Sequence, residues 1–174
     1  PLTRLPNHAA FMHQIDRAWT EARQQRQPLS LIFLDLDNFK LANDAFGHRF
    51  GDELLEWLGT FFPRTLPPDA FVARYSGEEF VIILPRTPLG SAAFLAEEIR
   101  ADMENRTFET SIGHAVLLSV SAGVAAVEPD AEDIMSAREL LHAADRAMYA
   151  AKRAGRNRVI RWSREVAAAL RVQA

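Results

Sequence analysis

Two hydrophobic periods alternate along the chain, one typical of helices and one typical of strands. Apolar residues at helical spacing predict helices over residues 8–26, 39–46, 52–62, 91–104 and 136–154. Near-continuous apolar runs predict strands over residues 29–34, 71–73, 80–84, 116–127 and 159–160. Because these elements alternate without a simple βαβ repeat, we expect an α+β fold, with a mixed β-sheet surrounded by helices.

Several predicted elements carry cap or turn signals at their ends. Asn7 is suited to cap the first helix, and Gly155 is suited to follow the last turn of the helix over residues 136–154. Residues 63–68 begin and end with proline, so we expect a loop there.

The remaining segments bear on domain organisation. Residues 107–112 are expected to pair with the 116–127 strand across Gly113-His114. The chain has no internal repeat and no linker long enough to divide it. We therefore expect residues 1–162 to form a single domain and residues 163–174 to be either a trailing helix or a vector-derived tail.

A pair of adjacent carboxylates follows the bend of the predicted hairpin. Runs 71–73 and 80–84 are joined through Ser76-Gly77, and Glu78 and Glu79 come directly after this small-residue pair. Two like charges at a tight turn repel each other, so the pair is a poor choice for stability alone. Two explanations stay open for these residues by themselves. They form a solvated acidic turn, or they bind a divalent cation, which prefers carboxylate oxygens.

A second pair of carboxylates ends the most apolar strand. Asp35 and Asp37 are separated by one residue, so they lie on the same side if the strand continues that far. Asp37 has a structural explanation, because it is placed to cap the turn before residues 39–41. Asp35 has a weaker one, since an unpaired carboxylate ending so apolar a strand is costly to bury. Nucleotidyl-transfer sites assemble metal ligands from such a strand-end acid and a neighbouring acidic hairpin, so we expect Asp35, Glu78 and Glu79 to converge.

Composition and charge narrow the class of protein. The chain has 174 residues, 48% hydrophobic and 25% charged, which suits one soluble globular domain. The net charge of −3 gives no reason to expect general nucleic-acid binding. With no cysteine there is no disulfide framework, which fits a reducing cytoplasm. No segment has the pattern of a membrane span or a signal peptide. The chain opens at Pro1-Leu2-Thr3, close to a helix start, so we expect further N-terminal segments in the full protein.

A series of short motifs, taken in order, resembles one known family. The motifs are Leu2-Thr3-Arg4-Leu5-Pro6-Asn7, Asp35-Leu36-Asp37-Asn38-Phe39-Lys40, Asn43-Asp44, Gly47-His48, Gly51-Asp52, Arg74-Tyr75-Ser76-Gly77-Glu78-Glu79-Phe80, Ser119-Val120-Ser121-Ala122-Gly123-Val124, Ala144-Asp145 and Tyr149-Ala150-Ala151-Lys152-Arg153-Ala154-Gly155-Arg156-Asn157-Arg158. Together they resemble the GGDEF domain of diguanylate cyclases over residues 2–159. One five-residue match would be weak, whereas this many matches in order are specific.

The resemblance implies a fold, a reaction and a set of partners. The fold is similar to nucleotide cyclase and polymerase palm domains, with a largely antiparallel sheet and a ferredoxin-like core. The reaction condenses two GTP molecules into the second messenger cyclic di-GMP and releases two pyrophosphates, with one GTP held by each of two facing domains. The implied partners are GTP, cyclic di-GMP, a second GGDEF domain and an N-terminal sensor or regulatory domain. The implied location is a cytoplasmic domain of a bacterial protein that could be membrane-anchored.

The resemblance also assigns metal ligands and a catalytic base. Asp35 matches a strand-end aspartate that binds Mg²⁺, and the Leu36 carbonyl matches a main-chain ligand. Glu78 matches an acid that binds metal and helps to deprotonate the 3′-hydroxyl. Glu79 matches the second acid of the motif, near the metals. The implied cofactor is two Mg²⁺ per GTP, for which Mn²⁺ can substitute.

Further matched positions imply how the nucleotide is held. Asn43 and Asp52 match the residues that recognise guanine, whose edge offers both an acceptor and paired N–H donors. The phosphate contacts implied by the resemblance are the loop amides around Asn38 and Phe39 and the cations Lys40, Lys152 and Arg156. Lys152 and Arg156 are four residues apart, so they are expected to share a face near the helix end.

Ser76 departs from the family pattern, because glycine is usual at this first position of the motif. If the turn requires a positive φ there, serine costs roughly 1 kcal/mol or more. We expect an active enzyme, since both glutamates, the strand-end aspartate, the guanine contacts and the phosphate cations are all present. The alternative is a catalytically inactive module that binds GTP or cyclic di-GMP and regulates a neighbouring domain. A third possibility is a palm-type nucleotidyl enzyme with another product.

Two further positions depart from the pattern. Many family members carry an Arg-x-x-Asp product-inhibition site just before the motif, and Pro67 and Ala70 occupy its two positions here. Asp69 is out of register by one residue and Arg64 is too far away, so no product inhibition is expected at that site. Arg4 stands where glycine is usual in the Leu-Thr-x-Leu segment.

Overall fold

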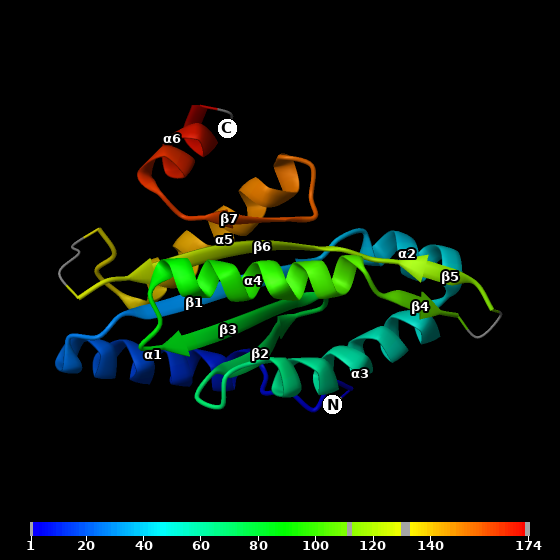
Figure 1. The fold of residues 1–174 in the computed structure, drawn as a ribbon, viewed down its shortest axis with the longest axis horizontal. Coiled ribbons are helices and arrows are strands. Elements are labelled where there is room, and N and C mark those ends of the chain that lie inside the picture. The colour runs from blue at the N-terminus through cyan, green and yellow to red at the C-terminus, as the bar shows by residue number, and fades with distance from the viewer. Residues whose placement is uncertain (1, 111–112, 130–132, 173–174) are drawn as a thin grey trace.

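The computed structural model describes residues 2–110, 113–129 and 133–172 (Figure 1). The elements follow in the order α1 (His8–Gln25), β1 (Leu29–Leu36), α2 (Phe39–Phe46), α3 (His48–Thr65), β2 (Phe71–Ser76), β3 (Glu79–Pro85), α4 (Leu89–Glu104), β4 (Thr107–Glu109), β5 (Ala115–Leu117), β6 (Val120–Val127), α5 (Ala137–Arg153), β7 (Arg158–Arg161) and α6 (Arg164–Val172).

β1 is the centre of a five-stranded mixed sheet with the order β2-β3-β1-β6-β7. β1 runs antiparallel to both β3 and β6, β2 runs antiparallel to β3, and β7 pairs parallel with β6. A two-stranded ribbon of β4 and β5 stands apart at one end of the molecule (Figure 1). All positions of β1 are buried, because helices cover both faces of the sheet. The predicted α+β fold with a largely antiparallel sheet is confirmed.

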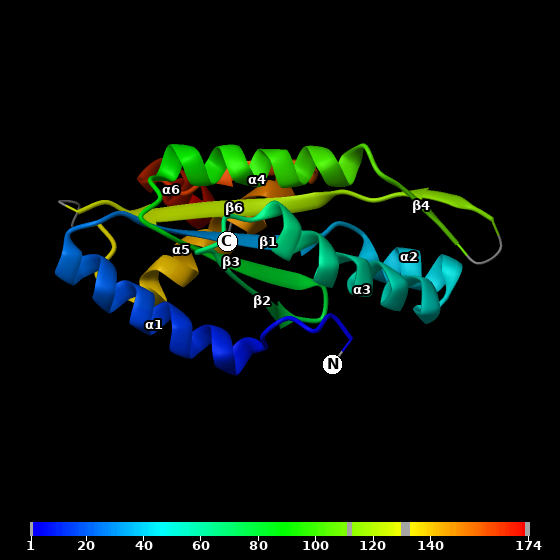
Figure 2. The same cartoon turned by 60° about the horizontal axis from the view of Figure 1, so that its bottom comes forward.

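Successive side chains of β1 belong to two cores on opposite faces of the sheet, as the period of a strand requires. Ile32, Leu34 and Leu36 belong to the core formed with α2, α3 and α4. Leu29, Leu31 and Phe33 belong to the core formed with α1 and α5. Figures 1 and 2 show α4 and α5 on opposite sides of the sheet. Asp35 is next in the second series, so it points toward α5.

α5 rests directly on β6 at Gly123. A Cβ atom at this position would lie 2.0 Å from the Ala144 carbonyl oxygen and 2.1 Å from the Met148 nitrogen. Because the contact is with helix backbone rather than with a flexible side chain, glycine is required there. This close approach fixes the distance between α5 and the sheet.

The segment before α1 packs against two elements that are distant in sequence. The Thr3 carbonyl oxygen would lie 2.0 Å from a Cβ at Gly59 of α3, and the Pro6 carbonyl accepts from the Arg74 N–H of β2 at 3.0 Å. Arg4 has a φ of 57°, in the left-handed region that glycine adopts most easily. This conformation gives a physical reason for glycine at the equivalent place in the family pattern.

Both predicted cap residues take the expected positions. The Asn7 side chain accepts from the Ala10 N–H at 3.0 Å and caps α1. Gly155 follows the C-cap Ala154 of α5 and has a φ of 114°. Within residues 163–174 the structure has the helix α6, and residues 173–174 lie outside the described ranges. In the described part of the chain, no helix combines the length and apolarity needed to cross a bilayer.

α3 is longer at both ends than the sequence predicted. It begins at His48 rather than Asp52, because Gly47 alone, with a φ of 87°, makes the break after α2. It continues over Pro63 to Thr65, so the predicted loop of residues 63–68 is wrong in its first half. The buried Phe62 side chain anchors this last turn, although Pro63 removes one helical N–H donor.

Two further expectations needed correction. The predicted 116–127 strand is divided into β5 and β6, because the Asp37 N–H donates to the Ser119 carbonyl between them at 2.9 Å. β4 pairs with β5 as predicted, although residues 111–112 of the predicted partner lie outside the described residues. The helical spacing of the apolar residues in 91–104 would place Phe94 on the buried face of α4, but Phe94 is 66% exposed. Its buried face is made mainly of alanines, with Ile99 and Met103.

Candidate active site

The Asp35 carboxylate lies at the end of β1 and is almost fully buried, with 4% of the residue exposed. Its Oδ2 lies 2.6 Å from Lys152 Nζ, whereas its buried Oδ1 has no hydrogen-bond partner. Burial, opposed by Lys152 and reinforced by the charges of Glu78 and Glu79, raises the pKa of Asp35 to about 6. Such a carboxylate is costly to bury unless a cation binds it.

The bend of the β2–β3 hairpin lies beside Asp35, at the same end of β1. Asp35 and Glu79 are partners across β1 and β3, and the Leu36 N–H donates to the Glu78 carbonyl oxygen at 3.2 Å. The Ser76 hydroxyl donates to Glu79 Oε2 at 2.6 Å. The structure therefore brings the strand-end acid and the two hairpin acids together at one end of the sheet.

The two residues expected to recognise guanine come from neighbouring helices. Asn43 lies on α2, and its Oδ1 is buried without a hydrogen-bond partner. Asp52 lies on α3 and is exposed. A Cβ at Gly51 would lie 2.0 Å from Asn43 Oδ1, so the absence of a side chain at Gly51 leaves room for the Asn43 amide. An unpaired amide oxygen beside an accessible carboxylate is suited to a ligand with N–H groups.

The residues expected to contact phosphates lie at two helix ends. Asn38 and Lys40 are exposed at the start of α2, where the first backbone N–H groups lack helical partners, and Phe39 is buried between them. Lys152 lies in the last turn of α5. The expectation that Lys152 and Arg156 share a helix face is wrong, because α5 ends before Arg156, which lies in the following turn with a φ of 63°.

Asp37 does not cap the turn before residues 39–41, as the sequence predicted. Its carboxylate is 2% exposed. It accepts from the Ser119 hydroxyl at 2.7 Å, the Ser121 hydroxyl at 2.6 Å and the Asn157 N–H at 2.9 Å. Asn38 occupies the N-cap position of α2, without a side-chain cap hydrogen bond. Asp37 therefore ties the end of β1 to β6 and to the turn after α5, and a fully satisfied buried carboxylate is a structural group.

The family model for "Diguanylate cyclase, GGDEF domain" matches residues 1–158. The chain belongs to this GGDEF family. The GGDEF chain is 40% identical over 157 residues to a diguanylate cyclase from Vibrio cholerae serotype O1, a match that covers 90% of this chain and 47% of the relative. The chain thus spans about half the length of that curated relative.

Solved GGDEF structures have the same fold. The GGDEF domain of DgcB from Caulobacter crescentus in complex with c-di-GMP superposes with a TM-score of 0.86 at 37% identity, covering 92% of this chain and 93% of that one. The active GGEEF domain of a diguanylate cyclase from Vibrio cholerae superposes with a TM-score of 0.84 at 35% identity, covering 92% of this chain and 99% of that one.

Ser76 fits the hairpin of this GGDEF domain without backbone strain. Its φ lies outside the left-handed region, and so does that of Gly77. The Arg74 guanidinium supports the bend by donating to the Gly77 carbonyl at 2.9 and 2.6 Å. The predicted cost of a positive φ at Ser76 therefore does not arise, and the serine hydroxyl gains a hydrogen bond to Glu79.

The carboxylates around Asp35 offer oxygen donors that a metal ion could bind. Across the described ranges, no group of three or more His, Cys, Asp or Glu side chains is gathered closely enough to hold an ion by itself. Two observations nevertheless fit a cation at Asp35. One carboxylate oxygen is buried without a partner, and a lysine ammonium neutralises the other. The family generally uses a divalent metal, and carboxylate and carbonyl oxygens are its preferred donors.

Asp145 of α5 belongs to a matched motif, but the sequence assigned it no role in this site. Burial raises the pKa of its carboxyl, and the Glu79 charge raises it further against the opposing charge of His142. Burial also raises the pKa of Tyr75, with Asp145 and Glu79 adding to the effect. Asp145 precedes Lys152 by seven residues, and this spacing on a helix places both on one face. That spacing is the signal that could have found it.

Proposed function

We propose that this chain is the catalytic domain of a diguanylate cyclase, which condenses two GTP molecules into cyclic di-GMP and two pyrophosphates. The observation that carries the proposal is the meeting of Asp35 with the Glu78-Glu79 pair beside the Lys152 ammonium. The similar Vibrio cholerae domain supports it, since that domain is described as active and its GGEEF motif has glutamate where this chain has Glu78.

Asn43 and Asp52 would hold the guanine base. The Asn43 oxygen is buried and unpaired, so a guanine N–H would satisfy it. The Asp52 carboxylate would accept from the remaining N–H groups of the same edge. An adenine ring offers a different donor pattern on that edge, so this pair favours GTP over ATP.

The phosphates would lie between the two helix ends. The amides around Asn38 and Phe39 would donate to the terminal phosphates, and Lys40 would add a positive charge from the first turn of α2. Lys152 and Arg156 would approach the same phosphates from the end of α5. These contacts would hold the triphosphate in place while the bond to pyrophosphate breaks.

In each half-reaction one bond forms and one bond breaks. The 3′-oxygen of one GTP attacks the α-phosphorus of the other, and the bond between the α-phosphorus and the bridging oxygen of pyrophosphate breaks. Glu78 takes the proton of the 3′-hydroxyl and passes it to solvent. Asp35, the Leu36 carbonyl, Glu78 and Glu79 would hold two Mg²⁺ per GTP, or Mn²⁺ in their place. When bound, these ions would neutralise phosphate charge and acidify the attacking hydroxyl.

Two domains are needed because each supplies one nucleotide. The chain is therefore expected to be weakly active as a monomer and more active when a second copy is brought to face it. We place this chemistry in the cytoplasm, where its substrate GTP is found, with a sensor or regulatory segment elsewhere in the full protein.

The inactive-module alternative rested on Ser76. Because Ser76 has an unstrained backbone and donates to Glu79, it gives that alternative no support. The chain also keeps both hairpin acids close to the strand-end acid, which a pure binding module would not require.

The test is product analysis. The purified chain is incubated at high concentration with GTP and Mg²⁺, and the nucleotides are separated and identified by mass spectrometry. We expect cyclic di-GMP and two pyrophosphates for each product molecule. Bound GTP without turnover, even after fusion to a dimerising coiled coil, would support the binding module instead. A different nucleotide product would support another palm-type enzyme.

Gly51→Ala is expected to raise the KM for GTP about ten-fold with little change in kcat, because the new methyl group would displace the Asn43 amide. Steady-state kinetics of the two variants Gly51→Ala and Gly90→Ala check this. Gly90 lies in the first turn of α4 with open space where a Cβ would be, so it is the matched control. An equal KM in both variants would show that Asn43 does not contribute to guanine binding.

No tight product binding is expected at the usual inhibition site, where Pro67 and Ala70 stand. Asp69, the nearest acid, already accepts from the Arg86 guanidinium at 2.6 Å. Isothermal titration of cyclic di-GMP into the wild type and into Asp69→Asn checks this. Tight binding that disappears in Asp69→Asn would contradict the prediction.

A further inference from the structure

Three consecutive residues after α5 have positive φ angles. Gly155, Arg156 and Asn157 have φ values of 114°, 63° and 46°. Glycine adopts such angles freely, whereas arginine does so only when its surroundings impose them. The Arg156 N–H donates to the Ala151 carbonyl at 3.0 Å, which folds the turn back against the end of α5. Something must hold this turn in so unusual a conformation.

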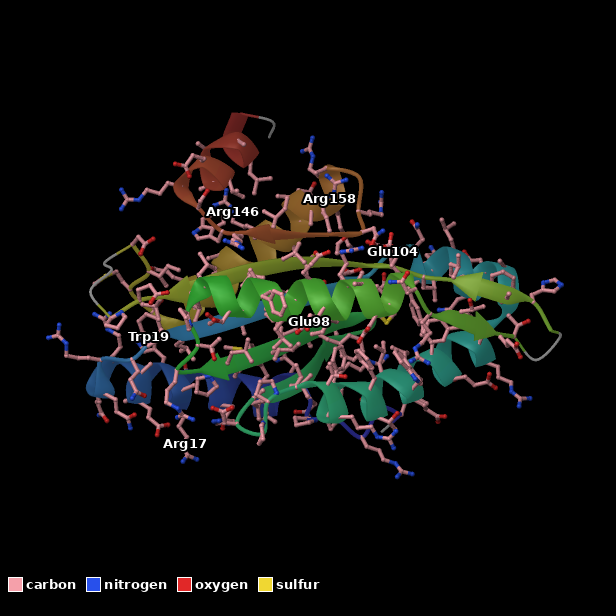
Figure 3. The ribbon with its side chains drawn as sticks, viewed as in Figure 1. Arg17, Trp19, Glu98, Glu104, Arg146 and Arg158 are labelled. Atoms are coloured by element: carbon pink, nitrogen blue, oxygen red, sulfur yellow. The ribbon has the colours of Figure 1, made fainter. Side chains whose placement is uncertain are left out.

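Asn157 fastens the turn to two other elements. Its N–H donates to Asp37 Oδ2 at 2.9 Å, after the end of β1. Its side-chain oxygen accepts from Arg100 Nη1 at 2.8 Å, and its side-chain nitrogen donates to Glu104 Oε1 at 2.7 Å. Glu104 and Arg158, which follows Asn157, are both labelled in Figure 3, at the end of α4 and at the start of β7. The carboxamide therefore bridges the turn to α4.

The groups that hold Asn157 are themselves fixed. The Arg100 side chain is 14% exposed and pairs with Glu97 at 2.6 Å and with Glu104 at 2.7 Å. Asp37 is held by two serine hydroxyls of the β6 region. Asn157 is thus anchored to two rigid points rather than to mobile surface side chains.

We propose that Asn157, held by Arg100, is the positioning residue that aims Arg156 at the nucleotide phosphates. The proposal rests on the phosphate role of Arg156 within the proposed function. Arg156 is exposed and follows the last turn of α5, so the direction of its side chain depends mainly on the backbone of the turn. The direction of its Cα–Cβ bond is set by the left-handed backbone, and that backbone is held through Asn157.

Loosening the turn should weaken the phosphate contact without unfolding the domain. A guanidinium that samples several directions loses part of the favourable binding that a preorganised one provides. The effect must therefore depend on Arg156 being present, which separates a positioning role from a general contribution to stability.

The test is a double-mutant cycle on the full chain, with kcat and KM for GTP measured together with the thermal unfolding midpoint. Asn157→Gly keeps the left-handed backbone and the N–H that donates to Asp37, and it removes the carboxamide. We expect it to lower kcat/KM about ten-fold, mainly through KM, with a midpoint close to that of the wild type. In the Arg156→Ala background the same change is expected to cost less than about two-fold.

A second variant weakens the support of the same turn through Arg100 of α4. Arg100→Met removes the partner of the Asn157 oxygen, and it should lower kcat/KM in the same direction and with the same dependence on Arg156. Arg23→Met is the control, because it makes the same change at an exposed arginine in the last turn of α1. It is expected to behave as the wild type does.

The outcomes separate the inference from the function on which it rests. If the wild type makes cyclic di-GMP but Asn157→Gly costs nothing, or costs the same factor with and without Arg156, the positioning role is wrong and the cyclase stands. If the wild type makes no cyclic di-GMP, the proposed function and the positioning role both fail.

Discussion

Replacing Glu78 with glutamine is expected to lower cyclic di-GMP formation about a thousand-fold while the domain still folds and still binds GTP. Glutamine keeps the size of the side chain but can neither take the 3′-hydroxyl proton nor supply a negatively charged oxygen. The hairpin should survive, because its link to β1 uses the Glu78 carbonyl rather than the side chain. The measurement is the initial rate of product formation, with circular dichroism to verify the fold.

The matched control is Glu98→Gln, which removes the same charge from the exposed side of α4 (Figure 3). This variant should keep the wild-type rate. If Glu78→Gln retained more than about a tenth of the wild-type rate, Glu78 would not be the general base, since loss of a general base typically lowers the rate far more.

Asp35→Asn is expected to have opposite effects on activity and stability. Product formation should fall below detection, because the neutral amide no longer supplies the charged oxygens of the site. The metal-free domain should become more stable at pH 7.5, because an ionised carboxylate with a buried, unpaired oxygen no longer has to be accommodated. Denaturant unfolding in the presence of a chelator measures this, with Asp16→Asn on the exposed surface of α1 as the charge-matched control.

The difference in unfolding free energy between the wild type and Asp35→Asn should depend on pH, because the pKa of Asp35 is raised. Asp35 has a folded pKa of about 6, against an ordinary value of 3.8. The folded state therefore binds the proton more tightly, and the stability that protonation contributes is complete below about pH 4 and lost as pH rises through 6. The free energy of unfolding of the wild type, relative to Asp35→Asn, should decrease by about 2 kcal/mol between pH 4 and pH 7.5. A pH-independent difference would show that the carboxyl is not perturbed.

The elements that position the acids could be predicted from local pattern. β1 is apolar at almost every position, and its end at Asp35 is marked by the first charge. The hairpin is marked by two apolar runs and a small-residue bend, so the approach of Glu78 and Glu79 could be expected as well. Both signals lie within short windows of sequence, where the period of the side chains determines which face they occupy.

The supports of the site could not be predicted in the same way. Asp37 is bonded to groups 82, 84 and 120 residues later in the chain, so no local pattern distinguishes it from a turn cap. Arg156 was expected on the face of a helix because the spacing from Lys152 is four, whereas α5 ends three residues earlier in a turn held by Asn157. Chain direction after a helix end depends on distant hydrogen bonds, which a spacing rule does not contain.

The packing of α5 on β6 at Gly123 determines which changes this GGDEF domain can tolerate. Lys152 reaches Asp35 at 2.6 Å from a helix whose height above the sheet is determined at Gly123, on another strand and in contact with neither charge. Any remodelling that thickened this layer would lift the ammonium from the carboxylate while leaving every active-site residue in place. The contact between Lys152 and Asp35 therefore depends on the absence of a side chain at Gly123, a residue outside the candidate site.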